Sequence, residues 1–248
     1  MKVLAIVQAR MGSTRLPNKV MREVGGISLI ELLLTRLSQS TARDQIVLAT
    51  SIDPKNIPLV QHVESLGYRS FQGSENDVLE RFVFAAQQFA GDIIIRITGD
   101  CPLIDPQLVD EAIHKFNTGD IDYLCNTNPP TFPDGLDIEV FSFAALQRAH
   151  NETRKPSDRE HVTPYIRESG HFSTLNVASD QDVSNLRWTV DEDQDLEVVR
   201  FVVEHFAPNR LFSWKDVLRI YETYSVELNK NSAIARNEGA RSLYLMQH

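Results

Sequence analysis

The chain has 248 residues, of which 42% are hydrophobic and 24% are charged, and its formal net charge at pH 7 is −9. This length can form one full hydrophobic core, so we expect a single domain over residues 1–248. The negative charge argues against a general nucleic-acid-binding protein, which needs a basic face to replace phosphate counterions. No apolar run is long enough to cross a bilayer, which argues against a membrane protein.

The first apolar run and the cysteines indicate the compartment. The run over residues 3–7 is too short for a secretory signal. Cys101 and Cys125 have no C-x-x-C spacing, so the sequence predicts neither a disulfide framework nor a zinc site. We therefore expect a cytoplasmic protein with reduced, buried thiols.

Short apolar runs rich in β-branched residues alternate along the chain with segments of helical periodicity. The runs that predict buried strands are 3–7, 45–50, 93–97, 121–124 and 186–190. The segments that predict helices are 28–37, 56–66, 78–89, 106–116 and 196–205. This alternation is typical of an α/β fold, here a mostly parallel, Rossmann-like sheet with helices on both faces.

Two regions depart from the alternating pattern. Residues 126–135 form a Pro-rich loop, and the polar-apolar alternation over 135–141 predicts an added antiparallel strand. We therefore expect a small antiparallel β insertion near 127–141. From about residue 225 the chain loses strand character, which predicts a polar helical tail.

Several acidic residues have positions typical of helix starts. Asp105 precedes Pro106 and is expected to cap the next helix. Most of the acidity at 192–195 is also expected to cap a helix, because negative charge suits its first turn. Three further patterns resemble capping boxes. They are Ser74-x-x-Asp77, Ser157-x-x-Glu160 and Ser213-x-x-Asp216.

The segment QARMGSTRLPNKV, residues 8–20, follows the first predicted strand, and no acidic residue precedes Glu23. Ligands bind at the carboxyl ends of strands in open α/β sheets, so this basic loop lies where a ligand is expected. Gly12 permits a tight turn, and the side chains around it can contact phosphate oxygens. These side chains are Arg10, Ser13, Thr14, Arg15 and Lys19. The loop lacks the Walker A pattern, and we interpret it as a triphosphate site in preference to a solvated basic turn.

Two aspartates follow other predicted strands. Asp100, in ITGDCPLID, comes at the end of the run 93–97, and Asp191, in WTVDEDQDLE, ends the run 186–190. Because the carboxyl ends of parallel strands meet at one edge of a sheet, both side chains would face the basic loop. Mg²⁺ takes one or two protein oxygens together with substrate phosphates, so this pair is suited to hold Mg²⁺.

Together, QARMGSTRLPNKV, TGDCPLI and VDEDQDLE resemble the cytidylyltransferases that make CMP-activated acidic sugars, the CMP-Kdo and CMP-sialic acid synthetases. GSENDVLERF, PDGLDIEVFS, REHVTPY and ARNEG most resemble the spore coat polysaccharide biosynthesis branch, and this likeness covers nearly the whole chain. The resemblance implies a nucleotidyltransferase that transfers CMP from CTP to a hydroxyl of a small 2-keto-3-deoxy sugar acid and releases pyrophosphate. It also implies a role in surface polysaccharide or glycan biosynthesis. A homodimer is implied as well, with residues 127–141 as a candidate contact element.

The resemblance also assigns roles to individual residues. Asp100 and Asp191 would hold Mg²⁺, and Asp191 or a hydroxyl bound to its metal would deprotonate the acceptor. Thr98 replaces the Gln that helps to read cytosine in the Kdo enzymes, and Thr189 replaces a second Asp of the sialic acid enzymes. The preferred base and the number of metal ions therefore stay open. The residues implied to bind CTP are Arg10, Gly12, Ser13, Arg15, Lys19 and Thr98.

Other polar residues are candidates for the acceptor side. Three carboxylates of the added strand either face a sugar pocket or lie on its solvent face. Three basic residues either contact a ligand or are surface charges, whereas Glu160 is expected to partner Ser157. The carboxylates are Asp134, Asp137 and Glu139, and the basic residues are Arg81, Arg159 and His161. Asn237-Glu238-Gly239 matches the family tail, and no physical role follows for it.

Two alternatives remain open. The protein could be a nucleotidyltransferase that uses another NTP or a non-sugar acceptor, because Thr98 weakens the argument for cytosine. It could also be a non-catalytic sugar-nucleotide-binding protein that keeps the fold. A pure binder has less need of a basic loop together with two aspartates at strand ends, although fold alone does not decide function. The acceptor itself depends on pocket geometry that the sequence does not give.

Overall fold

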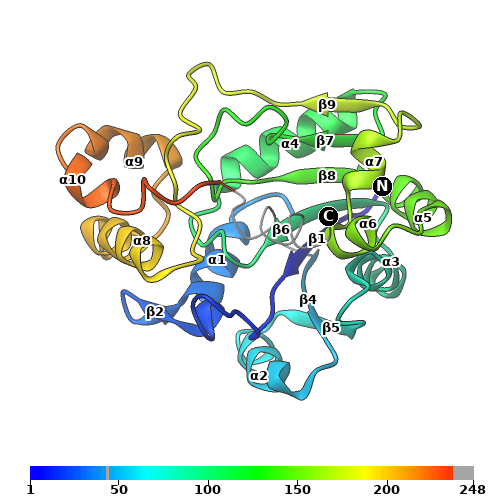
Figure 1. The fold of residues 1–248 in the computed structure, drawn as a ribbon, viewed down its shortest axis with the longest axis horizontal. Coiled ribbons are helices and arrows are strands. Elements are labelled where there is room, and N and C mark those ends of the chain that lie inside the picture. The colour runs from blue at the N-terminus through cyan, green and yellow to red at the C-terminus, as the bar shows by residue number, and fades with distance from the viewer. Residues whose placement is uncertain (43–44, 237–248) are drawn as a thin grey trace.

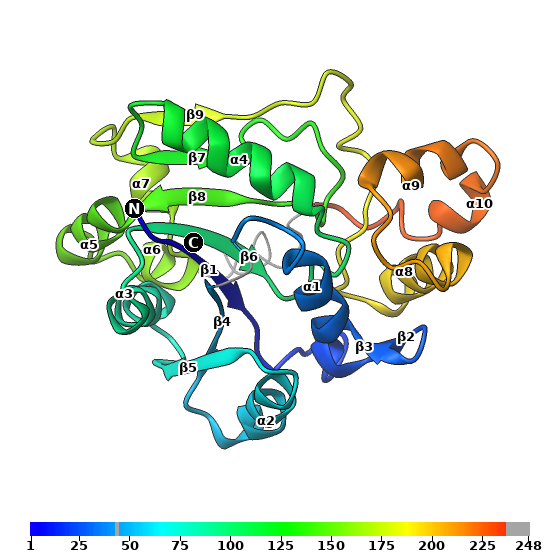
Figure 2. The same cartoon turned by 180° about the vertical axis from the view of Figure 1, so that it is seen from behind.

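The computed structural model describes residues 1–42 and 45–236. Within them, seven strands form one sheet, and helices cover both of its faces (Figure 1, Figure 2). The strands are β1 (Val3–Gln8), β4 (Ile46–Ser51), β5 (Arg69–Gly73), β6 (Ile93–Thr98), β7 (Tyr123–Cys125), β8 (Glu139–Ser142) and β9 (Thr174–Asn176). Their order across the sheet is β5-β4-β1-β6-β8-β7-β9.

The sheet is mostly parallel. β1 pairs in parallel with β4 and β6, β4 with β5, and β7 with β9. β8 runs antiparallel between β6 and β7. A separate antiparallel pair, β2 (Glu23–Val24) and β3 (Ile27–Ser28), follows the basic loop. The predicted α/β class is therefore confirmed, and the antiparallel strand expected within 135–141 is β8, which is part of the main sheet.

The predicted helices are all present, with bounds within three residues of the prediction. Helices α5 and α7 were not predicted, and α6 and α9 were indicated solely by the capping patterns at Ser157 and Ser213. The α-helices are α1 (Leu29–Leu37), α2 (Ile57–Ser65), α3 (Val78–Phe89), α4 (Pro106–Thr118), α5 (Phe143–Glu152), α6 (Pro156–His161), α7 (Pro164–Glu168), α8 (Asp193–Phe206), α9 (Trp214–Tyr221) and α10 (Ser225–Leu228). The 3₁₀ turns are η1 (Lys19–Met21) and η3 (Pro54–Asn56).

Two hydrophobic layers hold the helices on the sheet. Leu4 and Ile6 of β1 pack in a layer with α3 and α5, whereas Ala5 and Val7 pack in a layer with α1, α2, α4 and α8. Side chains alternate between the faces of a strand, so a strand buried on both faces is apolar along its whole length. This explains the continuous apolar run at the start of the chain.

The strand predicted at 186–190 does not form. Its single bridge joins Arg187 to Asp134. The N–H groups of Trp188 and Thr189 both donate to the carbonyl of Asp134, at 2.6 and 2.9 Å. Gly135 permits this approach, because a Cβ there would overlap the backbone of Thr189. The segment is buried, so its apolar composition indicated burial and not sheet pairing. Conversely, the edge strands β5 and β9 are polar and were not predicted.

The capping predictions have mixed outcomes. Asp105 caps α4, and Ser213 and Asp216 form a complete capping box. The box predicted at Ser157 is wrong, because Ser157 lies inside α6 and Lys155 precedes the helix. At α3 the cap is Asp77 itself, whose N–H donates to the Ser74 side chain at 3.0 Å. Glu192 and Asp195 form a capping box at α8, as the acidic cluster there predicted.

Three remaining expectations concern burial and the chain end. Cys101 and Cys125 are buried and form no disulfide within the described residues. In the same part of the chain no helix has the length and apolar character needed to cross a bilayer. The predicted helical tail begins with α10, which ends at Leu228. Asn237-Glu238-Gly239 lies outside the described residues.

Candidate active site

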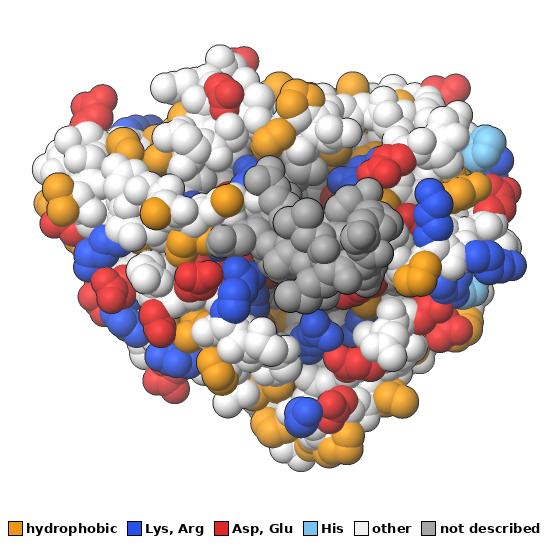
Figure 3. Space-filling view, in the orientation of Figure 1, with side chains coloured by type: hydrophobic (Ala, Val, Ile, Leu, Met, Phe, Trp, Pro, Cys, Tyr) orange, Lys and Arg blue, Asp and Glu red, His pale blue; other side chains and the backbone are white. Residues whose placement is uncertain are grey.

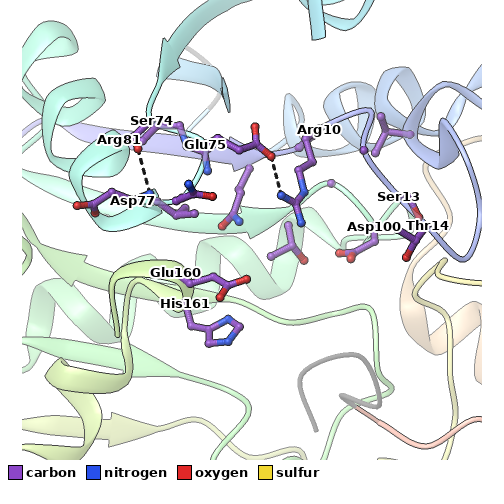
Figure 4. Close-up of a pocket in the computed structure, with 18 of the residues that line it drawn as sticks. Arg10, Ser13, Thr14, Ser74, Glu75, Asp77, Arg81, Asp100, Glu160 and His161 are labelled. Atoms are coloured by element: carbon purple, nitrogen blue, oxygen red, sulfur yellow. Dashed lines mark hydrogen bonds and ion pairs between the residues drawn. The ribbon is translucent and has the colours of Figure 1, made fainter. Parts of the chain in front are cut away.

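A cleft of about 1190 Å³ opens at the carboxyl ends of β1 and β6. Its walls come from the basic loop, the β5–α3 connection, α6 and the segment before α8. Figure 4 shows side chains from several of these elements extending into one shared space. On the face of the molecule in Figure 3, basic and acidic side chains are interspersed.

All the predicted nucleotide-binding residues of the basic loop line this cleft. Arg10 Nη1 lies 2.8 Å from Glu75 Oε1, and Arg15 Nη2 lies 3.3 Å from Asp191 Oδ2. Gly12 does not have a positive φ, and a Cβ there would meet nothing within 4 Å. The Ser13 N–H donates to the Met11 carbonyl at 2.9 Å, so the backbone does turn tightly around Gly12 as predicted, and the missing side chain leaves open space on the loop. The loop residues that line the cleft are Arg10, Gly12, Ser13, Thr14, Arg15 and Lys19.

Lys19 joins the two predicted aspartates. Its Nζ lies 3.0 Å from Asp100 Oδ2 and 2.7 Å from Asp191 Oδ1. Burial by itself would raise the pKa of Asp100, but the charge of Lys19 and a hydrogen bond from Thr98 hold that pKa at about 2. Burial also opposes the charge of Lys19, yet the two carboxylates raise the pKa of its ammonium. Asp100 is therefore a carboxylate and Lys19 an ammonium at neutral pH.

The wall between β5 and α3 contains two functional candidates. Arg81 was predicted as one, and Glu75 was not. Arg81 is only 2% exposed, so its interpretation as a surface charge is wrong. Arg81 Nε and Glu75 Oε2 have no hydrogen-bond partner within the described residues, although both side chains line the cleft. Burial lowers the pKa of Arg81 to about 10. The sequence pattern that indicates these candidates is the charged motif GSENDVLERF, which begins at the end of β5.

The opposite wall is α6. Glu160 and His161 extend into the cleft (Figure 4), and Arg159 also lines it. Arg159 Nε lies 2.5 Å from Asp77 Oδ2, which ties α6 to the start of α3. Burial lowers the pKa of His161, so its imidazole is neutral at pH 7. Glu160 therefore belongs to the cleft and is not the capping partner of Ser157.

A family model described as cytidylyltransferase matches residues 4–206. The chain belongs to the cytidylyltransferase family. The resemblance noted from the sequence is therefore confirmed, and the protein is a nucleotidyltransferase.

Individual relatives agree with this family. The chain is 34% identical over 205 residues to the spore coat polysaccharide biosynthesis protein SpsF of Bacillus subtilis, covering 80% of this chain and 85% of that protein. It is 33% identical over 118 residues to the 3-deoxy-manno-octulosonate cytidylyltransferase of Chloroherpeton thalassium, covering 47% of this chain and 46% of that one. The solved structure of a cytidylyltransferase from Leptospira borgpetersenii superposes with a TM-score of 0.90 at 32% identity, covering 95% of this chain and all of that chain.

Three predicted acceptor-side carboxylates of this cytidylyltransferase lie outside the cleft lining. Asp134 accepts from Arg187, and Asp137 accepts from Arg236 at 2.5 Å. Glu139 pairs with Arg96 and also accepts from the hydroxyls of Tyr123 and Thr163, at 2.5 and 2.6 Å. Burial raises the pKa of Asp137 to about 7. Neither predicted position is correct for Asp134 and Glu139, which form buried ion pairs, whereas the Asp137 side chain is 30% exposed and pairs with Arg236 outside the cleft lining.

The cytidylyltransferase could hold a metal ion at Asp100 and Asp191. Both carboxylates contact the same ammonium, so their oxygens converge on one point between them. Within residues 1–42 and 45–236, no set of three or more Asp, Glu, His or Cys side chains is arranged as a metal centre. Two carboxylates are nevertheless the donor set that Mg²⁺ uses when substrate phosphates supply the remaining ligands. The donor chemistry therefore fits Mg²⁺.

Proposed function

We propose that this cytidylyltransferase transfers CMP from CTP to a hydroxyl of an acidic 2-keto-3-deoxy sugar and releases pyrophosphate. The observation that carries the proposal is the contact of Lys19 with both Asp100 and Asp191 inside a cleft lined by the basic loop. This arrangement places cations for phosphate oxygens beside carboxylates for a metal ion. Such charge neutralisation is what phosphoryl transfer requires.

The triphosphate is proposed to lie along the basic loop. Arg10 and Arg15 can each form a bidentate contact with phosphate oxygens, and Lys19 supplies a compact charge. In the structure these cations pair with Glu75, Asp191 and Asp100. CTP would therefore exchange acidic partners within the protein for its phosphates.

The cytosine is proposed to lie against Thr98 and the β5–α3 wall. Thr98 ends β6 and lines the cleft, with its Oγ1 3.2 Å from Cys101 Sγ. Arg81 and Glu75 offer an unpartnered donor and an unpartnered acceptor on the same side. Cytosine presents an amino donor together with ring-nitrogen and carbonyl acceptors, so a donor and acceptor pair can satisfy it.

In the proposed reaction, the acceptor hydroxyl oxygen attacks the α-phosphorus of CTP. The bond from this phosphorus to the bridging oxygen breaks, and pyrophosphate leaves with that oxygen. The hydroxyl proton passes to Asp191, which faces the cleft. Arg15 and Lys19 stabilise the charge on the equatorial and leaving oxygens. Mg²⁺ held by Asp100 and Asp191 would supply further positive charge to the phosphates.

The acceptor is proposed to bind toward α6. Arg154, Arg159 and His161 give this wall basic groups and hydrogen-bond donors suited to a carboxylate and to hydroxyls. The similarity to a 3-deoxy-manno-octulosonate cytidylyltransferase supports an acidic sugar. The similarity to SpsF supports a role in surface polysaccharide biosynthesis.

The test is pyrophosphate release from each of the four NTPs with Mg²⁺, against acceptors that include 3-deoxy-2-keto acids of eight and nine carbons. We expect release with CTP and one keto acid. If pyrophosphate is released with a different NTP, that nucleotide is the substrate in place of CTP. Release only with a phosphorylated alcohol would replace the acceptor class, and CTP binding without turnover on any acceptor would favour a non-catalytic binding protein.

Three broader expectations belong to the same proposal. We infer a homodimer in the cytoplasm, built from single-domain chains, on the strength of the family resemblance. Light scattering of the purified protein would test the dimer, and fractionation of the source cells would test the location.

A further inference from the structure

We propose that Arg187 is a positioning residue that fixes the orientation of Asp191, and that Asn231 of the C-terminal segment completes this support. The inference rests on the proposed function, because it concerns how Asp191 is presented to Mg²⁺ and CTP. Neither Arg187 nor Asn231 lines the cleft. Both act from behind it.

Arg187 contacts three carboxylates with one guanidinium. Its side chain is only 5% exposed, and Nη1 donates to Asp134 Oδ2 at 2.8 Å. Nε and Nη2 donate to the two oxygens of Asp195 at 2.8 and 3.0 Å, in a bidentate pair. Nη2 also donates to Asp191 Oδ2 at 3.1 Å. A planar guanidinium can serve these partners together, whereas a lysine ammonium cannot form the bidentate contact.

Asp191 is held at two points by this cluster. The backbone N–H of Asp191 donates to Asp195 Oδ2 at 2.9 Å, and the Asp191 carboxylate accepts from Arg187. Asp195 is fully buried. Asp191 Oδ2 accepts from Arg187 and also lies 3.3 Å from Arg15 Nη2, whereas Oδ1 faces Lys19, at 2.7 Å. The capping residue Asp195 therefore has a second role, which is to fix the residue that faces the cleft.

The C-terminal segment closes the cluster. Asn231 is 1% exposed, and its Nδ2 donates to Asp195 Oδ1 at 2.8 Å and to the Arg187 carbonyl at 3.0 Å. Asn231 follows α10, and α10 packs beside α8 (Figure 1). A polar residue about 40 positions after Asp191 thus contacts the Asp195 carboxylate and the backbone carbonyl of Arg187.

On charge alone, removal of Arg187 is expected to raise the metal affinity of the site, whereas loss of a positioning contact is expected to lower it. Loss of a positive charge beside Asp191 would strengthen the attraction of that carboxylate for a divalent cation. A weaker metal affinity after a charge-conserving substitution would therefore report orientation and not charge. Arg187→Lys keeps the charge but loses the bidentate contact, and Asn231→Ala changes no charge at all. Residues that orient metal ligands typically change metal affinity by about 10- to 100-fold.

The experiment measures two affinities on the full chain. Mn²⁺ binding in the presence of CTP is followed by electron paramagnetic resonance, and CTP binding in EDTA is followed by calorimetry. Asn126→Ala is the matched control, because Asn126 is also buried and makes two hydrogen bonds, to Leu136 and Ile138, but lies outside the cleft lining. We expect Arg187→Lys and Asn231→Ala to weaken Mn²⁺ binding about tenfold while metal-free CTP affinity is unchanged. Asn126→Ala should change neither affinity.

The outcomes separate this inference from the proposed function. If wild-type protein binds Mn²⁺ with CTP and both variants bind it equally well, Arg187 and Asn231 do not position Asp191. The inference also fails if metal-free CTP affinity falls in parallel with Mn²⁺ affinity, since that indicates general disruption. If Arg187→Lys does not fold, Asn231→Ala alone decides. Wild-type protein that binds CTP but no Mn²⁺ would overturn the metal role in the proposed function, and with it this inference.

Discussion

Lys19 Nζ lies 2.7 Å from Asp191 Oδ1, although 172 positions separate the two residues in the chain. The contact brings the end of the basic loop against the segment that precedes α8. Because the same ammonium also contacts Asp100, the cation and both aspartates form one unit. Any nucleotide that recruits Lys19 to its phosphates would expose two carboxylates suited to a cation.

Loss of a single cation from the basic loop should strongly reduce turnover. We expect Arg15→Ala to lower kcat/KM for CTP about 100-fold or more, because it removes a donor that we propose to contact the phosphates. Arg22→Ala is the control, since Arg22 is exposed and lies outside the cleft lining. Steady-state pyrophosphate release measures both. Near-normal activity of the Arg15 variant would show that Arg15 has no role at the phosphates.

The low pKa of Asp100 predicts an acid-labile contribution to stability. The folded-state pKa is about 2, below the ordinary value of 3.8, so the native carboxyl binds its proton more weakly than the unfolded one. This contribution, about 2 kcal/mol, is full above pH 4 and is lost as the pH falls toward 2. Urea unfolding of wild type and Asp100→Asn should therefore give free energies that converge between pH 5 and pH 2. A difference in the free energy of unfolding that stays constant over this range would contradict the low pKa of Asp100.

Asp100→Asn should also reduce turnover strongly at neutral pH.

Arg81 should influence nucleotide affinity more than stability. Arg81→Lys keeps the charge but loses Nε, which has no hydrogen-bond partner within the described residues. We expect the KM for CTP to rise about tenfold, as for the loss of a hydrogen bond to a charged group. Arg148→Lys on the exposed surface of α5 is the control. An unchanged KM in the Arg81 variant would place the base elsewhere in the cleft.

Glu139 should matter for stability and not for nucleotide binding. Glu139→Gln leaves the partly buried Arg96 without its carboxylate partner, which we expect to lower the free energy of unfolding by about 3 kcal/mol. Denaturant titration would measure this loss. CTP affinity of the folded protein should be unchanged, because Glu139 lies outside the cleft lining. A large loss of CTP affinity with little loss of stability would contradict the structural role.

The sequence located two main parts of the candidate site because each lies next to a strand end. The basic loop and Asp100 both follow strands that are buried on two faces, and such strands are recognisable from apolar composition alone. Asp191 was located through a segment that turned out to be buried but unpaired, so the position was predicted correctly from a strand that does not exist. For Arg81 the sequence left ligand contact and surface exposure open, and Glu160 was predicted wrongly as a capping partner, because periodicity does not report which face of a helix meets a cleft.

By itself the sequence determined the α/β class, the five principal helices and the chemical character of the strand ends. These follow from local periodicity and from residue types, which act over a few neighbouring positions. Only the tertiary structure decided that Lys19 joins Asp100 to Asp191, that Asn231 donates to Asp195, and that Asp134, Asp137 and Glu139 each pair with an arginine. Each of these contacts joins residues far apart in the sequence, so it depends on packing and charge pairing across the fold that no local pattern encodes.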